Sequence, residues 1–119
     1  MAGGEFPSFV RTLLEADLPL EGLRGWLLAG DSGQVLFLEC GAEVDMPEHT
    51  HGSQWGIVVS GKVDLTVGGK TKTYICGESY TIAAGTPHKA HLHAGLRAID
   101  FFTDPDRYKP KVRKKQGEP

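Results

Sequence analysis

All five histidines lie between residues 49 and 93, and two of them, His49 and His51, are separated by one residue. On a β-strand, residues i and i+2 point to the same face, so these two imidazoles converge on one point. Neutral imidazoles are good ligands for divalent transition metals, which makes the pair a candidate metal site. The pair alone is equally consistent with two surface histidines on an exposed strand. The surrounding sequence is therefore needed to distinguish a metal site from this alternative.

The chain around this pair is divided by glycines into short segments with strand patterns. Residues 62–67 alternate apolar and polar side chains with a period of two, which is typical of a half-buried strand. Gly68 and Gly69 follow and predict a tight hairpin turn. Residues 8–15 fit either a short strand or a helical turn. Further strands are expected at 23–29, 34–40, 55–59, 71–75, 79–82, 89–93 and 96–103.

Helical periodicity is weak by comparison. No stretch after residue 20 has an apolar stripe with a 3.6-residue period over a helical length. Regularly spaced short strands with glycine turns instead predict an all-β protein, built as an antiparallel sandwich or barrel.

The segment that contains the histidine pair resembles the first motif of the cupin superfamily. That motif joins an HxH pair to an acidic or amide ligand a few residues later and then to an apolar strand that ends in glycine. In residues 47–61 these anchors are His49, His51, Gln54 and Gly61.

A second match lies downstream. Residues 77–88 resemble the second cupin motif, in which Gly77, Gly85 and His88 keep the expected spacing and Ala83 replaces the usual proline. The resemblance implies a cupin-type antiparallel β-barrel, or jelly roll. Within the superfamily the chain is most similar to small RmlC-like single-domain cupins with an HxHxxQWG segment.

The resemblance also implies a ligand set for one divalent transition metal, such as Zn, Mn, Fe or Ni. His49, His51 and His88 match the three histidine ligands, and Gln54 stands in the region of the usual glutamate. Gln54 shares a strand face with Val58, so it points into the barrel if Val58 does. A glutamine oxygen is neutral and leaves the metal charge unbalanced, which favours an anionic substrate. Alternatively, Gln54 forms hydrogen bonds beside a three-histidine metal.

Four other residues are weaker candidates. His91 and His93 have the opposite strand parity to His88, so we expect them to point away from the metal, toward solvent or a subunit interface. Asp100 interrupts an apolar run: inside the barrel it would be desolvated and suited to act as a general base, and outside it would pair with a cation. Tyr80 is a further candidate for catalysis.

Composition and charge limit the classes of protein to which the chain can belong. Residues 104–119 hold six basic and three acidic residues, and residues 1–103 hold seven and twelve, so the body is acidic and does not predict nucleic-acid binding. No apolar run approaches the roughly 20 residues of a membrane span, and no secretory signal is apparent. Cys40 and Cys76 are expected to be buried thiols, and the chain is expected to be cytoplasmic.

These observations predict three regions. Residues 1–20 are an N-terminal arm or strand, whose apolar residues are expected to contribute to a homodimer contact. Residues 21–104 form the cupin barrel, and residues 105–119 form a basic tail that we expect to be flexible. The resemblance implies a small metalloenzyme that acts on an anionic sugar acid or keto acid, as in the uronate-processing cupins. An oxygen-dependent dioxygenase and a non-enzymatic ligand-binding or sensing module remain the alternatives.

Overall fold

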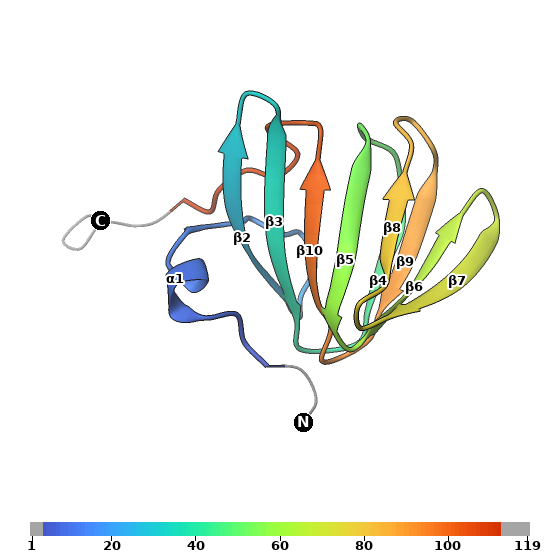
Figure 1. Cartoon of the computed structure of the whole chain (residues 1–119), viewed down its shortest axis with the longest axis horizontal. Helices are drawn as coiled ribbons and strands as arrows, with labels where there is room; N and C mark the ends of the chain where they lie inside the picture. The colour runs from blue at the N-terminus through green and yellow to red at the C-terminus, as the bar shows by residue number, and fades with distance from the viewer. Residues whose placement is uncertain (1–3, 113–119) are drawn as a thin grey trace.

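The computed structural model describes residues 4–112 and is almost entirely antiparallel β-sheet, as the sequence predicts (Figure 1). Its strands are short, and most of them are joined by tight turns. The elements are α1 (Ser8–Arg11), β1 (Leu14–Glu15), β2 (Leu23–Gly30), β3 (Gly33–Cys40), β4 (Val44–His49), β5 (Gln54–Ser60), β6 (Lys62–Val67), β7 (Lys70–Ile75), β8 (Ser79–Ile82), β9 (His88–Leu92) and β10 (Arg97–Phe102).

The strands form two sheets that face each other and enclose the core. One sheet has the order β1-β2-β3-β10-β5-β8 and the other has the order β4-β9-β6-β7. In Figure 1 the larger sheet runs from the left to the centre, and the smaller one closes the barrel on the right. Alternate residues of most strands point inward, and the buried side chains include Leu36, Leu38, Val58, Val63, Leu65, Ile82, Leu92 and Ala98.

The predicted hairpin at residues 62–75 is confirmed. β6 begins at Lys62 and ends at Val67, and Val67 pairs with Lys70 across the turn. Gly68 and Gly69 have φ angles of 58° and 80°, in the left-handed region that glycine adopts without a steric penalty. The period-two alternation therefore predicted the strand, and the two glycines predicted its turn.

The N-terminal arm folds back on the outer face of the larger sheet. Phe6 and Val10 are buried against Trp26 of β2, so this arm covers an apolar patch of its own chain. Both alternatives for residues 8–15 occur in part, because α1 is a single helical turn and β1 follows it. β1 pairs with β2 through Leu14 and Leu27.

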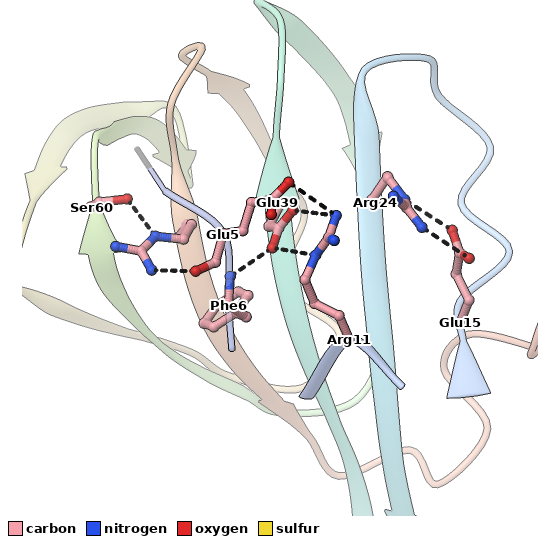
Figure 2. Close-up of polar contacts among 8 residues, drawn as sticks. Glu5, Phe6, Arg11, Glu15, Arg24, Glu39 and Ser60 are labelled. Atoms are coloured by element: carbon pink, nitrogen blue, oxygen red, sulfur yellow. Dashed lines mark hydrogen bonds and ion pairs between the residues drawn. The ribbon is translucent and has the colours of Figure 1, made fainter. Parts of the chain in front are cut away.

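Polar contacts hold the arm in place, as Figure 2 shows. A carboxylate oxygen of Glu39 accepts hydrogen bonds from the Phe6 backbone amide at 2.8 Å and from Arg11 Nε at 3.2 Å. Arg24 donates to Glu15 at 3.3 Å, and Arg97 donates to the Glu5 backbone carbonyl at 3.3 Å. The arm is thus fixed at both its apolar and its polar side.

The C-terminal segment of the described chain returns across the barrel. The Gln34 side-chain amide donates to the Tyr108 carbonyl at 2.9 Å, and its oxygen accepts from the Tyr108 amide at 3.0 Å. Ala16 forms an isolated bridge with Pro110. The rest of the predicted basic tail, residues 113–119, lies outside the described residues, so its flexibility stays a prediction.

The two cysteines differ in their surroundings. Cys40 is buried, as expected, but Cys76 is exposed, so that part of the prediction is wrong. Cys76 lies in the turn between β7 and β8, where the chain leaves the sheet and Gly77 has a φ of 88°.

Among residues 4–112, no helix has the length and apolar character needed to cross a membrane.

Candidate metal centre

Three histidines meet inside the barrel. His49 is the last residue of β4, His88 is the first residue of β9, and the two are cross-strand partners. His51 lies in the loop after β4, so the expectation that both histidines of the pair lie on one strand is wrong. One nitrogen of each imidazole lies within 4.8 Å of the other two, and the Nε2 atoms of His51 and His88 are 3.1 Å apart.

Backbone carbonyls set the orientation of all three rings. The Nδ1 atoms of His49, His51 and His88 lie 2.8 Å from the carbonyl oxygens of residues 47, 52 and 86, respectively. A carbonyl oxygen only accepts hydrogen bonds, so each Nδ1 carries the proton and each Nε2 keeps its lone pair. Three such lone pairs in one cluster fit a divalent metal, and metal-bound histidines commonly have this kind of outer partner.

The surroundings favour the neutral form of the His49 and His51 imidazoles. Burial lowers the pKa of both His49 and His51, and the positive charge of Arg107 lowers it further. The hydrogen bonds to the carbonyls of Pro47 and Gly52 oppose these effects. Neutral imidazole is the form that binds metal, so His49 and His51 are available as ligands near neutral pH.

Gln54, the first residue of β5, lines the same cavity as the three histidines. Its predicted strand phase is confirmed, since Val58 on the same face is buried and Trp55 on the other is 43% exposed. The Gln54 side-chain nitrogen donates to Asp100 Oδ1 at 2.9 Å. Because the amide nitrogen is engaged in this way, the carbonyl oxygen Oε1 is left for another partner.

Asp100 points into the barrel, so of its two interpretations the interior one is right. Its Oδ1 also accepts a hydrogen bond from the Tyr80 hydroxyl at 2.7 Å. Burial raises the pKa of Asp100 to about 6, although the hydrogen bonds from Tyr80 and Gln54 lower it. Burial beside Asp100 also raises the pKa of Tyr80 well above its usual value, so Tyr80 keeps its proton.

Arg107 is the residue of the cavity that sequence reasoning missed. Its guanidinium carbon lies 4.3 Å from the centre of the Tyr108 ring, and its Nε is buried without a hydrogen-bond partner. Within residues 4–112, no carboxylate forms an ion pair with it. Its place in a basic segment after the last strand suggested a solvated tail, and no local pattern indicated otherwise.

The other two histidines lie elsewhere, as their strand parity predicted. His91 and His93 contact acidic side chains on the outer face of the smaller sheet and take no part in the barrel cluster. The barrel therefore holds three imidazoles, one amide and one carboxylate, with a cation at its edge. Imidazole nitrogens beside an amide or carboxylate oxygen suit Zn, Mn, Fe or Ni.

Comparisons with known proteins agree with this geometry. The family model described as "Cupin domain" matches residues 35–102. No curated protein matches the chain significantly. An RmlC-like cupin from Shewanella frigidimarina NCIMB 400 is similar, with 26% sequence identity and a TM-score of 0.73. The match covers 90% of this chain and 96% of the Shewanella chain.

Two further solved structures share the fold. KdgF from Halomonas sp. has a TM-score of 0.68 at 20% identity, covering 77% of this chain and 86% of its own. Salicylate 1,2-dioxygenase from Pseudaminobacter salicylatoxidans has a TM-score of 0.66 at 14% identity, covering 73% of this chain and 28% of its own. The same dioxygenase is known in adducts with gentisate, so this fold accommodates small-molecule ligands. With both motifs, the jelly-roll topology and the three-histidine cluster in place, the chain belongs to the cupin superfamily.

Proposed function

We propose that this cupin is a small metal-dependent enzyme that acts on an anionic sugar acid or keto acid, as an isomerase or lyase. The observation that carries the proposal is Arg107, which lines the cavity of the three-histidine cluster and has a buried Nε without a partner. An unsatisfied buried donor costs about 1–3 kcal/mol, and more when the group is charged. A substrate carboxylate in the cavity would remove this cost and pair with the guanidinium.

In this proposal His49, His51, His88 and the Gln54 oxygen hold one divalent transition metal. When bound, the metal supplies Lewis-acid polarisation of a carbonyl or hydroxyl oxygen. All four ligands are neutral, and the positive charge of Arg107 offsets the negative charge of a deprotonated Asp100, so the loaded cavity keeps a net charge of about +2. An anionic substrate is therefore favoured over a neutral one.

Asp100 is the group placed to move a proton. Its Oδ1 is occupied by Tyr80 and Gln54, whereas its Oδ2 accepts no hydrogen bond from residues 4–112. A carboxylate with a pKa of about 6 is matched to proton transfer near neutral pH. We assign Oδ2 the role of accepting a proton from a carbon next to the substrate carbonyl and returning it, which is the step an isomerase needs.

Binding and turnover by the metal-loaded protein test the proposal. Calorimetric titration is expected to detect galacturonate or 2-oxoglutarate but not neutral galactose. Arg107→Ala is expected to weaken acid binding about ten-fold or more, since a charge-assisted contact contributes roughly 1.5–3 kcal/mol. Lys109→Ala is the matched control, because Lys109 is a nearby exposed cation paired with Asp106.

Proton transfer is followed separately, as exchange of substrate C–H for deuterium by NMR. Asp100→Asn is expected to slow it by about 10²–10⁴-fold while acid binding and metal content are retained. Failure of every acid to bind would contradict the proposal. Oxygen consumption by the iron-loaded protein would instead support a dioxygenase, and binding without turnover would support a sensing module.

A further inference from the structure

A second cluster of metal-binding side chains lies on the outside of the barrel. His91 is in β9, His93 follows its end, and Glu43 immediately precedes β4. One donor atom of each lies within 4.8 Å of the other two. On β9, His88 and Leu92 are buried in the barrel, whereas the His91 side chain is 34% exposed on the opposite face. This outer cluster is therefore separate from the barrel cluster.

One oxygen of Glu43 faces both imidazoles. Glu43 Oε1 lies 2.9 Å from His91 Nε2 and 3.2 Å from His93 Nδ1. Two atoms that each lie about 2.1 Å from one metal ion are about 3.0–3.4 Å apart at bond angles of about 90–110°. The two observed separations are close to this range, and the donor atoms of the two imidazoles lie within 4.8 Å of each other.

The far nitrogen of each imidazole contacts its own carboxylate. His91 Nδ1 lies 2.6 Å from Asp45 Oδ1, and His93 Nε2 lies 2.8 Å from Asp64 Oδ2. A carboxylate accepts the proton of the imidazole nitrogen it contacts, so Asp45 and Asp64 would keep the far nitrogens protonated while the nitrogens nearer Glu43 bind a metal ion. Pairs of this kind, carboxylate to histidine to metal, orient ligands at many metal centres.

Two of the three carboxylates are themselves held in place. Glu43 Oε2 accepts a hydrogen bond from the Ala94 backbone amide at 2.6 Å, and Asp64 Oδ1 accepts one from Thr73 at 2.5 Å. Without a metal ion, a protonated His91 donates to both Asp45 and Glu43, and these hydrogen bonds raise the pKa of His91. A divalent ion bound between His91 and Glu43 would take the place of the proton on Nε2. For the part of the chain that the structure describes, the ion-pair partners of Glu43, Asp45 and Asp64 are these two histidines alone.

We propose that Glu43, His91 and His93 form a second metal site, for a divalent transition metal such as Zn²⁺, with Asp45 and Asp64 orienting its two imidazoles. Three carboxylates around two neutral imidazoles carry a charge of about −3, which a divalent ion reduces to about −1. Imidazole ligands favour zinc-like metals over Ca²⁺ or Mg²⁺. The site is open to solvent, and it ties the start of β4 to β9 and to the turn that follows β9.

Zinc stoichiometry tests the proposal without reference to the enzymatic function. Equilibrium dialysis followed by elemental analysis is expected to give two Zn²⁺ per wild-type chain. His91→Ala/His93→Ala is expected to bind one, and so is the barrel variant His51→Ala/His88→Ala. Circular dichroism checks that each variant is folded. One Zn²⁺ in the wild type that is unchanged in His91→Ala/His93→Ala would overturn the proposal, even if the barrel variant did not fold.

Affinity measurements test the role of the orienting carboxylates. In calorimetric titration with Zn²⁺ alone, Asp45→Asn and Asp64→Asn are each expected to weaken the outer site about 10–100-fold and to leave the barrel site unchanged. Lys89→Ala is the matched control, since Lys89 lies on the outer face of β9 and offers no ligand to this cluster. Unchanged outer-site affinity in both Asn variants would overturn the arrangement, because the imidazoles would then be held by other means.

Discussion

At the scale of single residues, the barrel site depends on the orientation of the Gln54 side-chain amide. Gln54 donates to Asp100 at 2.9 Å, and Asp100 also accepts from the Tyr80 hydroxyl at 2.7 Å. Tyr80 and the Gln54 nitrogen only donate to this carboxylate, so the direction of the chain is set. The amide oxygen of Gln54 is left without a partner in this chain of hydrogen bonds, and the oxygen is the atom with which an amide coordinates metal ions.

We expect Gln54→Glu to retain the metal and to bind anions less well. The added carboxylate lowers the net charge of the loaded site from about +2 to about +1, and the loss of a charge-assisted contact weakens binding about ten-fold or more. Titration of both proteins with a panel of sugar acids and keto acids measures the effect. Thr81→Glu, which adds the same charge at an exposed position of β8, serves as the control. Equal affinities of the two proteins for every acid would mean that the neutral Gln54 side chain does not contribute to the preference for anionic substrates.

A second prediction at this scale concerns pH. The pKa values of His49 and His51 lie below the ordinary 6.5, so the neutral, metal-binding form persists as the solution is acidified. Metal affinity of the barrel site in His91→Ala/His93→Ala is expected to be level down to about pH 6.5 and to fall below it. An affinity that already declines above the ordinary histidine pKa would contradict this.

The same shifts link pH to the stability of the metal-free protein. The unfolded chain, with the higher histidine pKa, takes up protons first as the pH falls through 6.5. The contribution of these two residues to the free energy of unfolding therefore rises with pH across this range. Urea unfolding of the wild type and of His49→Ala/His51→Ala at several pH values measures the difference.

At the scale of elements, the site depends on close contact between neighbouring strands. Gly56 of β5 pairs with Asp100 of β10 on one side and with Tyr80 of β8 on the other. A Cβ at Gly56 would overlap Asp100 Oδ1 and would lie 2.5 Å from the Tyr80 ring. The absence of a side chain at this position is what lets Tyr80 reach Asp100 across β5.

We expect Gly56→Ala to lower the free energy of unfolding by about 1–3 kcal/mol, the usual range for overpacking a core. It is also expected to slow proton transfer by moving Asp100, with the metal content unchanged. Chemical denaturation and the deuterium-exchange assay measure the two effects. Gly30→Ala is the control, because a Cβ at Gly30 would meet nothing within 4 Å. Equal stability of the two variants would show that the strands adjust freely.

At the scale of the whole molecule, the outer face of the larger sheet carries an uncovered apolar row. Leu28, Val35, Phe101 and Trp55 are consecutive cross-strand partners on β2, β3, β10 and β5. Leu28 is 50% exposed and Trp55 is 43% exposed. Much of the apolar N-terminal arm that was expected to form a dimer contact instead covers its own sheet, so this row is the better candidate for an interface.

We expect a homodimer, with a mass about twice the 12.9 kDa of one chain by light scattering at micromolar concentration. Trp55→Glu is expected to reduce the mass to that of a single chain, because it places a charge in the middle of an apolar contact. Ile75→Glu is the control, since Ile75 is similarly exposed but lies on β7 of the other sheet. A monomeric wild type would contradict the prediction outright.

Much of the fold was predictable from local pattern, because strands and turns are governed by near neighbours. The alternation at residues 62–67 and the two glycines after it determine a hairpin regardless of the rest of the chain. β4 was the exception: Pro47 and the charged residues around it hide the strand pattern, and the HxH pair alone marked its end. His51 lies beyond that end, yet its ring still reaches the cluster.

Within the site, spacing and resemblance determined the three histidines and the phase of Gln54. Only the tertiary structure decided the rest, because it depends on contacts between residues distant in sequence. The sequence allowed the Asp100 side chain to point into the barrel or out of it. The tertiary structure decides for the interior, where Gln54 of β5 and Tyr80 of β8 donate hydrogen bonds to it. No sequence pattern around Arg107 indicates that it lines the cavity, because it reaches the cavity only when the chain crosses the barrel after the last strand. The outer cluster likewise joins residues from β4, β6 and β9, which meet only when the smaller sheet has formed.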